Sequence, residues 1–523
     1  MAEANQQPVI EFLSHPSAWP DVPAGATVER IETHSAIVFL VGPRAYKLKR
    51  AVRYDYLDFS TVERRERFCR AEVALNQRTA PDLYRGVVAV TRERDGRLAV
   101  AGQGVAVDFL VEMERFAGEQ LLDRVAARGE LDPALMPPLA RAIAALHATA
   151  AVRHDRTGVG VMRWVVGGNA AGFANEGRLI LDAAQATRVV TASQLAIARH
   201  ASLLDARAAA GCIRECHGDL HLRNIVLRDG RPVLFDAVEF NDDISCIDVL
   251  YDVAFLLMDL WRLGLHRQAN ALFNAYVMAT FAPDTCGALA LLPLFLSCRS
   301  AVRAKTGATS SRLQTDPQQG AALADTARSY LAAAETFLRP PPPALVAIGG
   351  LSGSGKTTMA KAIGAHLGAP PGAVVLRSDV LRKRMAGVPE TDRLGPDGYT
   401  PAMHARVYAA LGEWAESALR AGHSVIVDAV FGSEDERRAI TDLAARLGVP
   451  HTTLWLEAPL EVLTARVDAR RDDASDATAP IVARQVSQGL DASVTWPRIP
   501  AHEPIAHVEA RVREALTPHL RVL

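Results

Sequence analysis

The sequence predicts a multidomain protein in which an α+β domain precedes an α/β domain with a doubly wound parallel sheet. Three observations support this prediction. Short β-like runs occupy residues 28–112, whereas long Ala- and Leu-rich helical segments fill residues 117–338. Four consecutive prolines then interrupt the chain. Over residues 344–523, strand-like and helical segments alternate, which is typical of a parallel sheet covered by helices.

The domain boundaries follow from these changes of pattern. The first domain is expected to span residues 1–338, and one helix at residues 61–78 interrupts its β-rich lobe. Because no helix interior tolerates a run of prolines, residues 339–343 are expected to form a stiff linker. The second domain is expected to span residues 344–523.

Composition limits the class of protein. A chain of 523 residues is too long for one core, and its 49% hydrophobic and 22% charged residues are typical of globular domains. The net charge of -1 shows no basic excess, so nucleic acid is not a favoured partner. The six cysteines lack paired spacing, and neither a signal peptide nor an apolar run long enough for a membrane span is evident. We therefore expect a cytoplasmic protein without a membrane partner.

The stretch "GLSGSGKT", residues 350–357, fits the pattern G-x4-G-K-T between an apolar strand and a helix. Glycines let backbone N–H groups face phosphate oxygens, Lys356 can reach the terminal phosphates, and the Thr357 hydroxyl can hold Mg²⁺. The candidate cofactor-binding residues are Gly350, Ser352, Gly353, Ser354, Gly355, Lys356, Thr357 and Thr358.

Two later strand-like runs end in aspartate, "LRSD" with Asp379 and "VIVD" with Asp428. Ligands of open α/β sheets bind at the carboxyl ends of strands, so both side chains are expected near the phosphates. Asp428 is the candidate metal residue, and Asp379 is the candidate acceptor of a substrate hydroxyl's proton. For either one, a helix cap or a solvated loop position is the alternative.

Residues 344–523 resemble the small P-loop kinases of the adenylate-kinase, gluconate-kinase and zeta-toxin type. The resemblance implies that an Asp after the second strand contacts the acceptor and that a lid presents arginines to the transferring phosphoryl group. In the matching segment "LTARVDARRDDASDA" the candidates are Arg466, Arg470 and Arg471, with a solvated helix face as the alternative. The basic run at residues 382–384 either binds an anionic acceptor or forms a surface.

A second motif, "HGDLHLRN", places Asp219 five residues before Asn224, a spacing typical of kinase catalytic loops. There the Asp orients or takes up the proton of the acceptor hydroxyl, and the Asn coordinates Mg²⁺. Twelve residues after Asn224, an apolar strand ends in Asp236, a second candidate metal ligand.

Upstream, strand alternation puts Lys47 and Lys49 on one face of a hairpin, where either could reach the phosphates. We favour Lys47 because it lies nearer the middle of the strand, and keep Lys49 as the alternative. Glu72 in the following helix is the candidate partner of that lysine, with Glu63 and Glu66 as competitors.

These residues resemble the aminoglycoside phosphotransferase and choline kinase branch of the protein-kinase-like fold, over residues 28–338. The resemblance implies a bilobal domain whose hinge, residues 110–116, holds adenine by its backbone, with Glu114 and Phe116 as cofactor-binding residues. It also implies that Asp248 and Asp252 are buried supports of the catalytic loop. The segment "ETHSAIVF" stands where a Gly-rich phosphate loop is usual, so backbone or Ser35 contacts must replace it.

Together the two halves resemble bacterial proteins that fuse an aminoglycoside-phosphotransferase-like module to a P-loop ATP-binding module. This predicts a bifunctional, ATP- and Mg²⁺-dependent kinase that phosphorylates hydroxyls of small molecules at two sites. One alternative is a catalytic domain regulated by a nucleotide-sensing or toxin-like partner domain. Another is a nucleic-acid 5′-hydroxyl kinase, which the near-zero net charge does not support.

The acceptor and the oligomeric state are not predicted by these motifs. Arg299, Arg303 and Lys305 fall on one possible helix face, which favours an anionic or polar acceptor. The alternative is that this face only packs and contacts solvent.

Overall fold

The computed structural model describes residues 2–19, 27–470 and 473–517. The chain divides into two compact units, Met1–Trp164 with Leu204–Leu256, and Val165–Leu203 with Leu257–Leu523. This division passes through the helical segments before the proline run. The expected boundary at residues 339–343 therefore stays a prediction, although the prolines do lie between the end of a helix at Phe337 and the start of a strand at Leu345.

The first unit contains a six-stranded antiparallel sheet with the strand order β1-β2-β3-β8-β6-β7. The five predicted β-like runs, at residues 35–41, 44–50, 84–93, 98–102 and 105–113, all form strands, and β1 is an additional one. The strands are β1 (Glu29–Glu32), β2 (Ala36–Val41), β3 (Arg44–Lys49), β6 (Tyr84–Arg92), β7 (Leu98–Val100) and β8 (Val105–Glu114), with a small separate hairpin of β4 (Arg53–Tyr54) and β5 (Leu57–Asp58).

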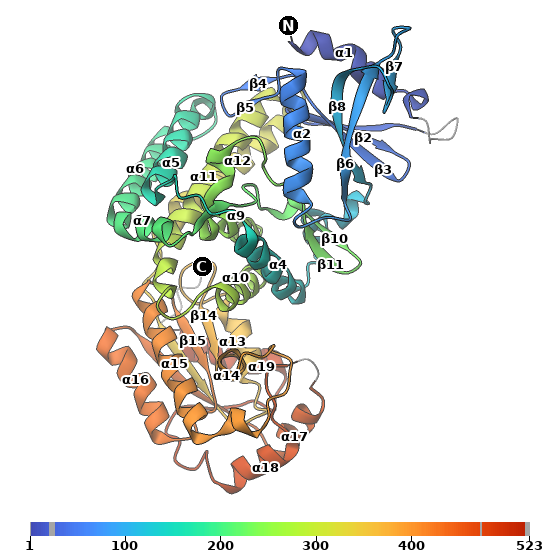
Figure 1. Ribbon diagram of the computed structural model, residues 1–523. Helices are drawn as coiled ribbons and strands as arrows, with labels where there is room; N and C mark the ends of the chain where they lie inside the picture. Colours follow the sequence, from blue (N-terminus) through green and yellow to red (C-terminus); the bar gives the residue numbers. More distant parts are fainter. Residues whose placement is uncertain (1, 20–26, 471–472, 518–523) are drawn as a thin grey trace. The chain divides into compact units, whose positions relative to one another are not determined.

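Helices pack on both faces of this sheet. The expected helix is α2 (Val62–Asn76), which lies along the sheet in Figure 1 and buries Cys69 and Val73 against it. The opposite face is covered by α1 (Ala2–Leu13), whose Leu13 packs into a core with Phe39. The sequence analysis did not predict α1, because Pro8 lies inside it and disfavours a helix.

The remaining elements of the first unit precede and follow the "HGDLHLRN" loop in the chain. This loop lies between β9, which pairs with β12, and the hairpin of β10 and β11. Two helices, α5 and α9, continue from this unit into the second. The elements are α3 (Leu122–Ala127), α4 (Met136–Thr149), α5 (Gly158–Ala174), α7 (Ala201–Ala209), β9 (Ile213–Glu215), β10 (Ile225–Arg228), β11 (Arg231–Leu234), α8 (Asp242–Ser245), β12 (Cys246–Asp248) and α9 (Val249–Arg262).

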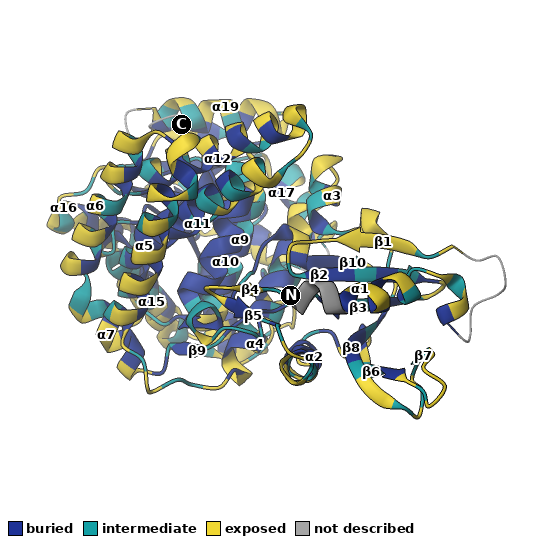
Figure 2. Ribbon diagram, turned by 90° about the horizontal axis from the view of Figure 1, so that it is seen from above, coloured by how far each residue is buried: buried dark blue, intermediate teal, exposed yellow. Residues whose placement is uncertain are grey.

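The second unit begins with four helices, α6 (Ala183–Arg199), α10 (His266–Thr280), α11 (Leu292–Leu313) and α12 (Pro317–Phe337). Helices α11 and α12 pack along each other. Within the described residues, the stretch Cys286–Leu313 is long and apolar enough to cross a membrane by length and composition alone. However, 72% of its most apolar window is buried inside the protein, and the first half of α11 is mostly dark blue in Figure 2.

The same unit contains the expected parallel sheet, with five strands in the order β14-β15-β13-β16-β17. Its strands are β13 (Leu345–Gly349), β14 (Val374–Arg377), β15 (Val425–Asp428), β16 (His451–Glu457) and β17 (Arg498–Pro500). Helices α13 and α19 bury one face in a shared core, and α15 packs on β14 and β15. The helices are α13 (Lys356–Gly364), α14 (Ser378–Met385), α15 (Pro401–Arg420), α16 (Glu434–Leu447), α17 (Leu460–Asp468), α18 (Ala479–Ser487) and α19 (Ile505–Leu516).

Side-chain amides join α10 to the edge strand β14. Asn270 donates to the carbonyls of Pro371 and Ala373, each at 3.0 Å. Asn274 donates to the Ala373 carbonyl and accepts from the Val375 N–H. Because these groups are buried or half-buried, the helical segment and the parallel sheet form one packed body, in agreement with the observed unit boundary.

Two candidate active sites

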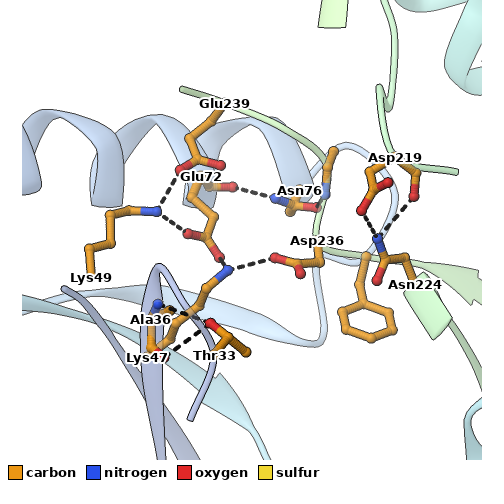
Figure 3. A network of polar contacts seen from close by, with 12 residues as sticks. Thr33, Ala36, Lys47, Lys49, Glu72, Asn76, Asp219, Asn224, Asp236 and Glu239 are labelled. Carbon is orange, nitrogen blue, oxygen red and sulfur yellow. Dashed lines mark hydrogen bonds and ion pairs between the residues drawn. The ribbon is translucent and has the colours of Figure 1, made fainter. Parts of the chain in front are cut away.

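The catalytic-loop motif is folded so that its Asp and Asn meet. The Asn224 amide donates to the backbone carbonyl of Asp219 at 2.9 Å and to its carboxylate at 3.1 Å (Figure 3). His221 lies 3.3 Å from the same carboxylate. The Asp219 side chain nevertheless keeps 42% of its surface exposed. This arrangement leaves a fixed carboxylate that a hydroxyl group can approach.

Of the two aspartates that the resemblance implies as buried supports of this loop, Asp252 bonds to it directly. Asp252 accepts hydrogen bonds from the N–H groups of His217 and Gly218 and lies 3.1 Å from the His147 ring. Asp248 pairs with Arg207 through two hydrogen bonds of 2.7 Å. Because these contacts engage the Asp252 carboxylate, we interpret it as a structural support of the loop rather than as a metal ligand.

Both candidate lysines of β3 lie against Glu72 of α2 (Figure 3). Lys47 contacts Glu72 at 2.8 Å and Asp236 at 2.6 Å. Lys49 contacts Glu72 and Glu239, each at 2.5 Å. The Lys47 side chain is 17% exposed and that of Lys49 only 2%, so the geometry favours Lys47 as the lysine that a nucleotide can reach.

Burial and charge together set the protonation of this cluster. Burial alone would raise the pKa of Glu72, but Lys47 and Lys49 hold it at about 2. Burial would also lower the pKa of Lys47, but Asp236 and Glu72 outweigh that effect and leave it well above its ordinary value. For Glu239, burial prevails over the attraction of Lys49 and raises the pKa. Glu72 is therefore the firmly ionised partner of both lysines, whereas Glu63 is exposed and Glu66 pairs with Arg70.

Long-range hydrogen bonds fix the segment of the candidate metal residue. Asp236 adopts φ of 60°, in the left-handed region, and its N–H donates to the Tyr84 hydroxyl. Asn76 donates to the Glu72 carbonyl and accepts from the Ala237 N–H at 2.8 Å. The helix that holds Glu72 and the loop that holds Asp236 are thereby tied together.

Only some of the residues expected to contact the nucleotide in this half lie in loops. Of the expected hinge, residues 110–114 belong to strand β8. The Glu114 side chain pairs with Arg44 and Arg85, and its N–H donates to the Leu83 carbonyl, so Glu114 is part of the sheet. Phe116 packs edge-on against Phe235. Ser35 lies in the turn between β1 and β2, where its carbonyl accepts from the Arg50 N–H.

In the second unit, the "GLSGSGKT" loop joins β13 to α13 as expected. Lys356 donates to the carbonyls of Gly350 and Leu351, at 2.8 and 2.9 Å. Gly353 has φ of +88°, and a Cβ there would lie 2.6 Å from the Leu463 carbonyl oxygen, so this position requires glycine. Six of the candidate residues besides Lys356 line one cavity of about 570 Å³ with it, namely Ser352, Gly353, Ser354, Gly355, Thr357 and Thr358.

Both candidate aspartates line the same cavity. The Thr357 hydroxyl donates to Asp428 at 2.6 Å, which is the pairing expected of a metal-binding threonine and carboxylate. Asp379 lies in the first turn of α14, directly after β14. Burial raises the pKa of Asp379. Burial also lowers the pKa of Lys356 despite the attraction of Asp428 and Asp379.

The expected arginines differ in their roles. Arg466 lines the cavity but donates to the carbonyls of Ala501 and Gly353. Arg470 also lines the cavity, and Arg471 lies outside the described residues. In the basic run at 382–384, Arg382 and Lys383 are buried and bond to Gly398 and Asp476, whereas Arg384 is exposed and donates to the carbonyls of Met278 and Phe281. Arg299 is buried, at 4% exposure, so it does not lie on a solvent-exposed helix face.

Sequence analysis missed several polar residues of both sites. Glu239 has no motif of its own, although it follows Asp236 by three residues. In the second site, Arg377 bonds to Asp473 at 2.9 Å and lies 3.6 Å from Asp428. Arg377 directly precedes the "SD" of the predicted strand end, so its position at the phosphate edge could have been inferred.

Comparison with known proteins agrees with the presence of two candidate active sites. Residues 46–289 match the phosphotransferase enzyme family, and residues 345–490 match the AAA domain family. An uncharacterized protein of Mycobacterium tuberculosis (strain ATCC 25618 / H37Rv) is 30% identical over 469 residues, which cover 88% of this chain and 90% of the relative. The chain belongs to the family of this mycobacterial protein, and it combines a domain of the phosphotransferase enzyme family with a second domain of the AAA family.

Two further similarities are shorter, and each covers only part of the chain. An adenylyl-sulfate kinase of Myxococcus xanthus (strain DK1622) is 30% identical over 118 residues, 22% of this chain and 59% of the relative. The crystal structure of a choline/ethanolamine kinase family protein from Mesorhizobium loti is 14% identical with a TM-score of 0.36, and the match covers 63% of this chain and 99% of that one.

Proposed function

We propose that each of the two sites transfers the γ-phosphoryl group of ATP to a hydroxyl of a small molecule. The observation that supports this most is that each site pairs a lysine suited to phosphate with an aspartate suited to a hydroxyl. In the first unit these are Lys47 and the partly exposed Asp219. In the second they are Lys356 and Asp379, which line one cavity.

In the kinase-like site, the proposed roles follow from the contacts. Glu72 fixes the direction of Lys47, whose ammonium would contact the phosphates. The acceptor hydroxyl would donate its proton toward Asp219, which Asn224 and His221 hold in place. Such a site works by positioning and charge neutralisation, without a covalent enzyme intermediate.

In the P-loop site, backbone N–H groups of the loop and Lys356 would bind the β- and γ-phosphates. Asp379 would take up the proton of the acceptor hydroxyl. Its raised pKa suits this role, because a base with a pKa nearer neutrality holds the proton more readily. Arg470 lines the same cavity and would neutralise charge on the transferring group.

The donor atoms of both sites fit Mg²⁺, which prefers oxygen ligands. Asn224 and Asp236 would hold it in the first site, and Thr357 and Asp428 in the second. When bound, Mg²⁺ would offset the negative charge of the phosphates. We place this activity in the cytoplasm because all six cysteines are free thiols, and we propose no membrane or nucleic-acid partner.

The test measures phosphoryl transfer by the full chain with Mg²⁺ and γ-labelled ATP. A pool of small hydroxyl compounds serves as acceptor, and adenylyl sulfate is included because the Myxococcus relative is named for it. Asp219→Asn and Lys356→Ala should each abolish transfer to a different set of products, detected by mass spectrometry. Exposed Asp325→Asn is the matched control for Asp219→Asn and should change neither set.

If Asp219→Asn and Lys356→Ala both leave every product unchanged, the proposal is wrong. If only one of them removes products while the other abolishes ATP binding alone, one domain is a nucleotide sensor and the protein is not bifunctional.

A further inference from the structure

A serine from the segment after α17 lies inside the P-loop cavity. Ser475 lines this cavity together with Lys356, Thr357 and Asp379. Within this cavity its hydroxyl lies near the Asp379 carboxylate, where it acts to lower the pKa that burial raises. In the proposed function, Asp379 receives the proton of the acceptor. The protein's own hydroxyl group therefore lies in the cavity where an acceptor hydroxyl would bind.

Carboxylates on both sides of Ser475 hold it there. Asp473 accepts from the Arg377 guanidinium and from the Ser475 N–H, each at 2.9 Å. On the other side, Asp476 accepts from the Lys383 ammonium at 2.9 Å and from the Tyr399 hydroxyl at 2.7 Å.

Buried residues in and around this segment fix the position of residues 473–476. Lys383 is 1% exposed, so its ammonium depends on Asp476 for compensation of its charge. Ala474, between Asp473 and Ser475, is 3% exposed and packs inward. The segment 473–476 is thus directed into the site by its own side chains, and Ser475 does not simply face solvent at a loop tip.

Three other hydroxyls of the cavity, those of Thr357, Ser354 and Ser378, are less suited to accept a phosphoryl group. The Thr357 hydroxyl is engaged with Asp428. Ser354 is completely buried, and Ser378 is 8% exposed. Ser475 is half-buried and lines the cavity together with the proposed base, Asp379.

We propose that Ser475 is an internal phosphoryl acceptor, and that the P-loop site phosphorylates it when no small-molecule acceptor is bound. This inference rests on the proposed function of the P-loop site. The Ser475 Oγ attacks the γ-phosphorus of ATP, and its proton passes to the Asp379 carboxylate. The bond from the γ-phosphorus to the bridging oxygen breaks, and ADP leaves with that electron pair.

Phosphorylation would change the contacts of the segment. A phosphoserine has a charge of about -1.5 to -2 near neutral pH. Placed between Asp473 and Asp476, it would repel both carboxylates and compete for Arg377 and Lys383. The modified segment would then leave the Asp379 carboxylate.

The test incubates the full chain with Mg²⁺ and γ-³²P-labelled ATP in the absence of an acceptor. Tandem mass spectrometry then locates the phosphate, which is expected on Ser475. Ser475→Ala should reduce the incorporated label at least tenfold, whereas Ser475→Thr, which keeps a hydroxyl, should retain it. Ser487→Ala on α18 is the matched control, since Ser487 is exposed and bonds only within its helix in the described structure.

Two further variants assign the label to its site. Asp379→Asn should lose it although Ser475 is present, and Asp219→Asn should keep it because that residue belongs to the other site. ATP binding and turnover with the acceptor pool are measured on the same samples.

The outcomes separate the two proposals. If ATP is bound and passed to an acceptor at the P-loop site while Ser475 stays unlabelled, or if another residue has the label, the inference about Ser475 is wrong and the proposed function stands. If Lys356→Ala changes neither ATP binding nor turnover, the proposed function of this site fails, and the inference fails with it.

Discussion

The two candidate sites hold their lysines in opposite ways. In the kinase-like site, Lys47 and Lys49 contact carboxylates from distant parts of the chain, Glu72, Asp236 and Glu239 (Figure 3). In the P-loop site, Lys356 bonds to carbonyl groups of its own loop, five and six residues away.

This difference predicts different weaknesses. A site built from side chains of separate elements depends on buried charge balance and on tertiary packing. A site built from one loop depends on the backbone conformation of that loop, and hence on glycine. The predictions below test this comparison, starting from the largest expected effect.

Gly353→Ala should affect only the P-loop site. The new Cβ would lie 2.6 Å from the Leu463 carbonyl oxygen on a residue with φ of +88°, so the loop must shift. A shift of this kind should lower transfer at that site by about a hundredfold or more. Steady-state kinetics of each product measures it. Gly412→Ala is the control, because its Cβ would meet no atom within 4 Å. Equal losses in both products would contradict the comparison.

Lys49→Met should lower the free energy of unfolding of the first unit. The substitution leaves Glu72 and Glu239 buried beside one another with only Lys47 for compensation. Removing one partner of a buried ion pair costs about 3–5 kcal/mol of unfolding free energy. Urea unfolding followed by circular dichroism measures the change.

Adding Glu239→Gln to Lys49→Met should restore part of the loss, because it removes one of the uncompensated carboxylates. Exposed Arg420→Met serves as the control. An unchanged unfolding midpoint in Lys49→Met would show that the pair does not stabilise the unit.

Asn76→Ala should loosen the kinase-like site alone. It leaves the buried Ala237 N–H without its acceptor and unties α2 from the Asp236 segment. An unsatisfied buried group costs about 1–3 kcal/mol. We expect that loss of stability, and a lower rate for the products that depend on Asp219. Exposed Asn175→Ala is the control. Wild-type rates and stability in Asn76→Ala would contradict this role.

The pH dependence of the P-loop site should show the raised pKa of Asp379. The carboxylate must be ionised to take up a proton, so kcat/KM should fall as the pH drops through that pKa. Because burial raises the pKa of Asp379, the acid limb of the profile should lie above the ordinary Asp pKa of about 3.9. A pH profile of kcat/KM for the products lost in Lys356→Ala measures this limb. An apparent pKa at or below that ordinary value would argue against Asp379 as the base.

The sequence predicted most of the fold because its local signals were strong. Short β-like runs predicted five of the six strands of the first sheet, and the loop "GLSGSGKT" placed the start of α13. The elements that were not predicted are the helix that contains Pro8 and the short strands β1 and β17 at sheet edges. Edge strands and proline-containing helices are stabilised mainly by packing, which no local pattern reports.

By itself, the sequence determined which residues are chemically suited to each site, since Lys356, Thr357, Asp219 and Asn224 lie in contiguous motifs. Only the tertiary structure decided how the remaining groups pair. It placed Glu239 on Lys49 and Asp473 on Arg377, and it placed Ser475 in the cavity that Asp379 lines. The reason is that a contact between distant segments depends on packing and on charge compensation in the interior, which sequence spacing does not encode.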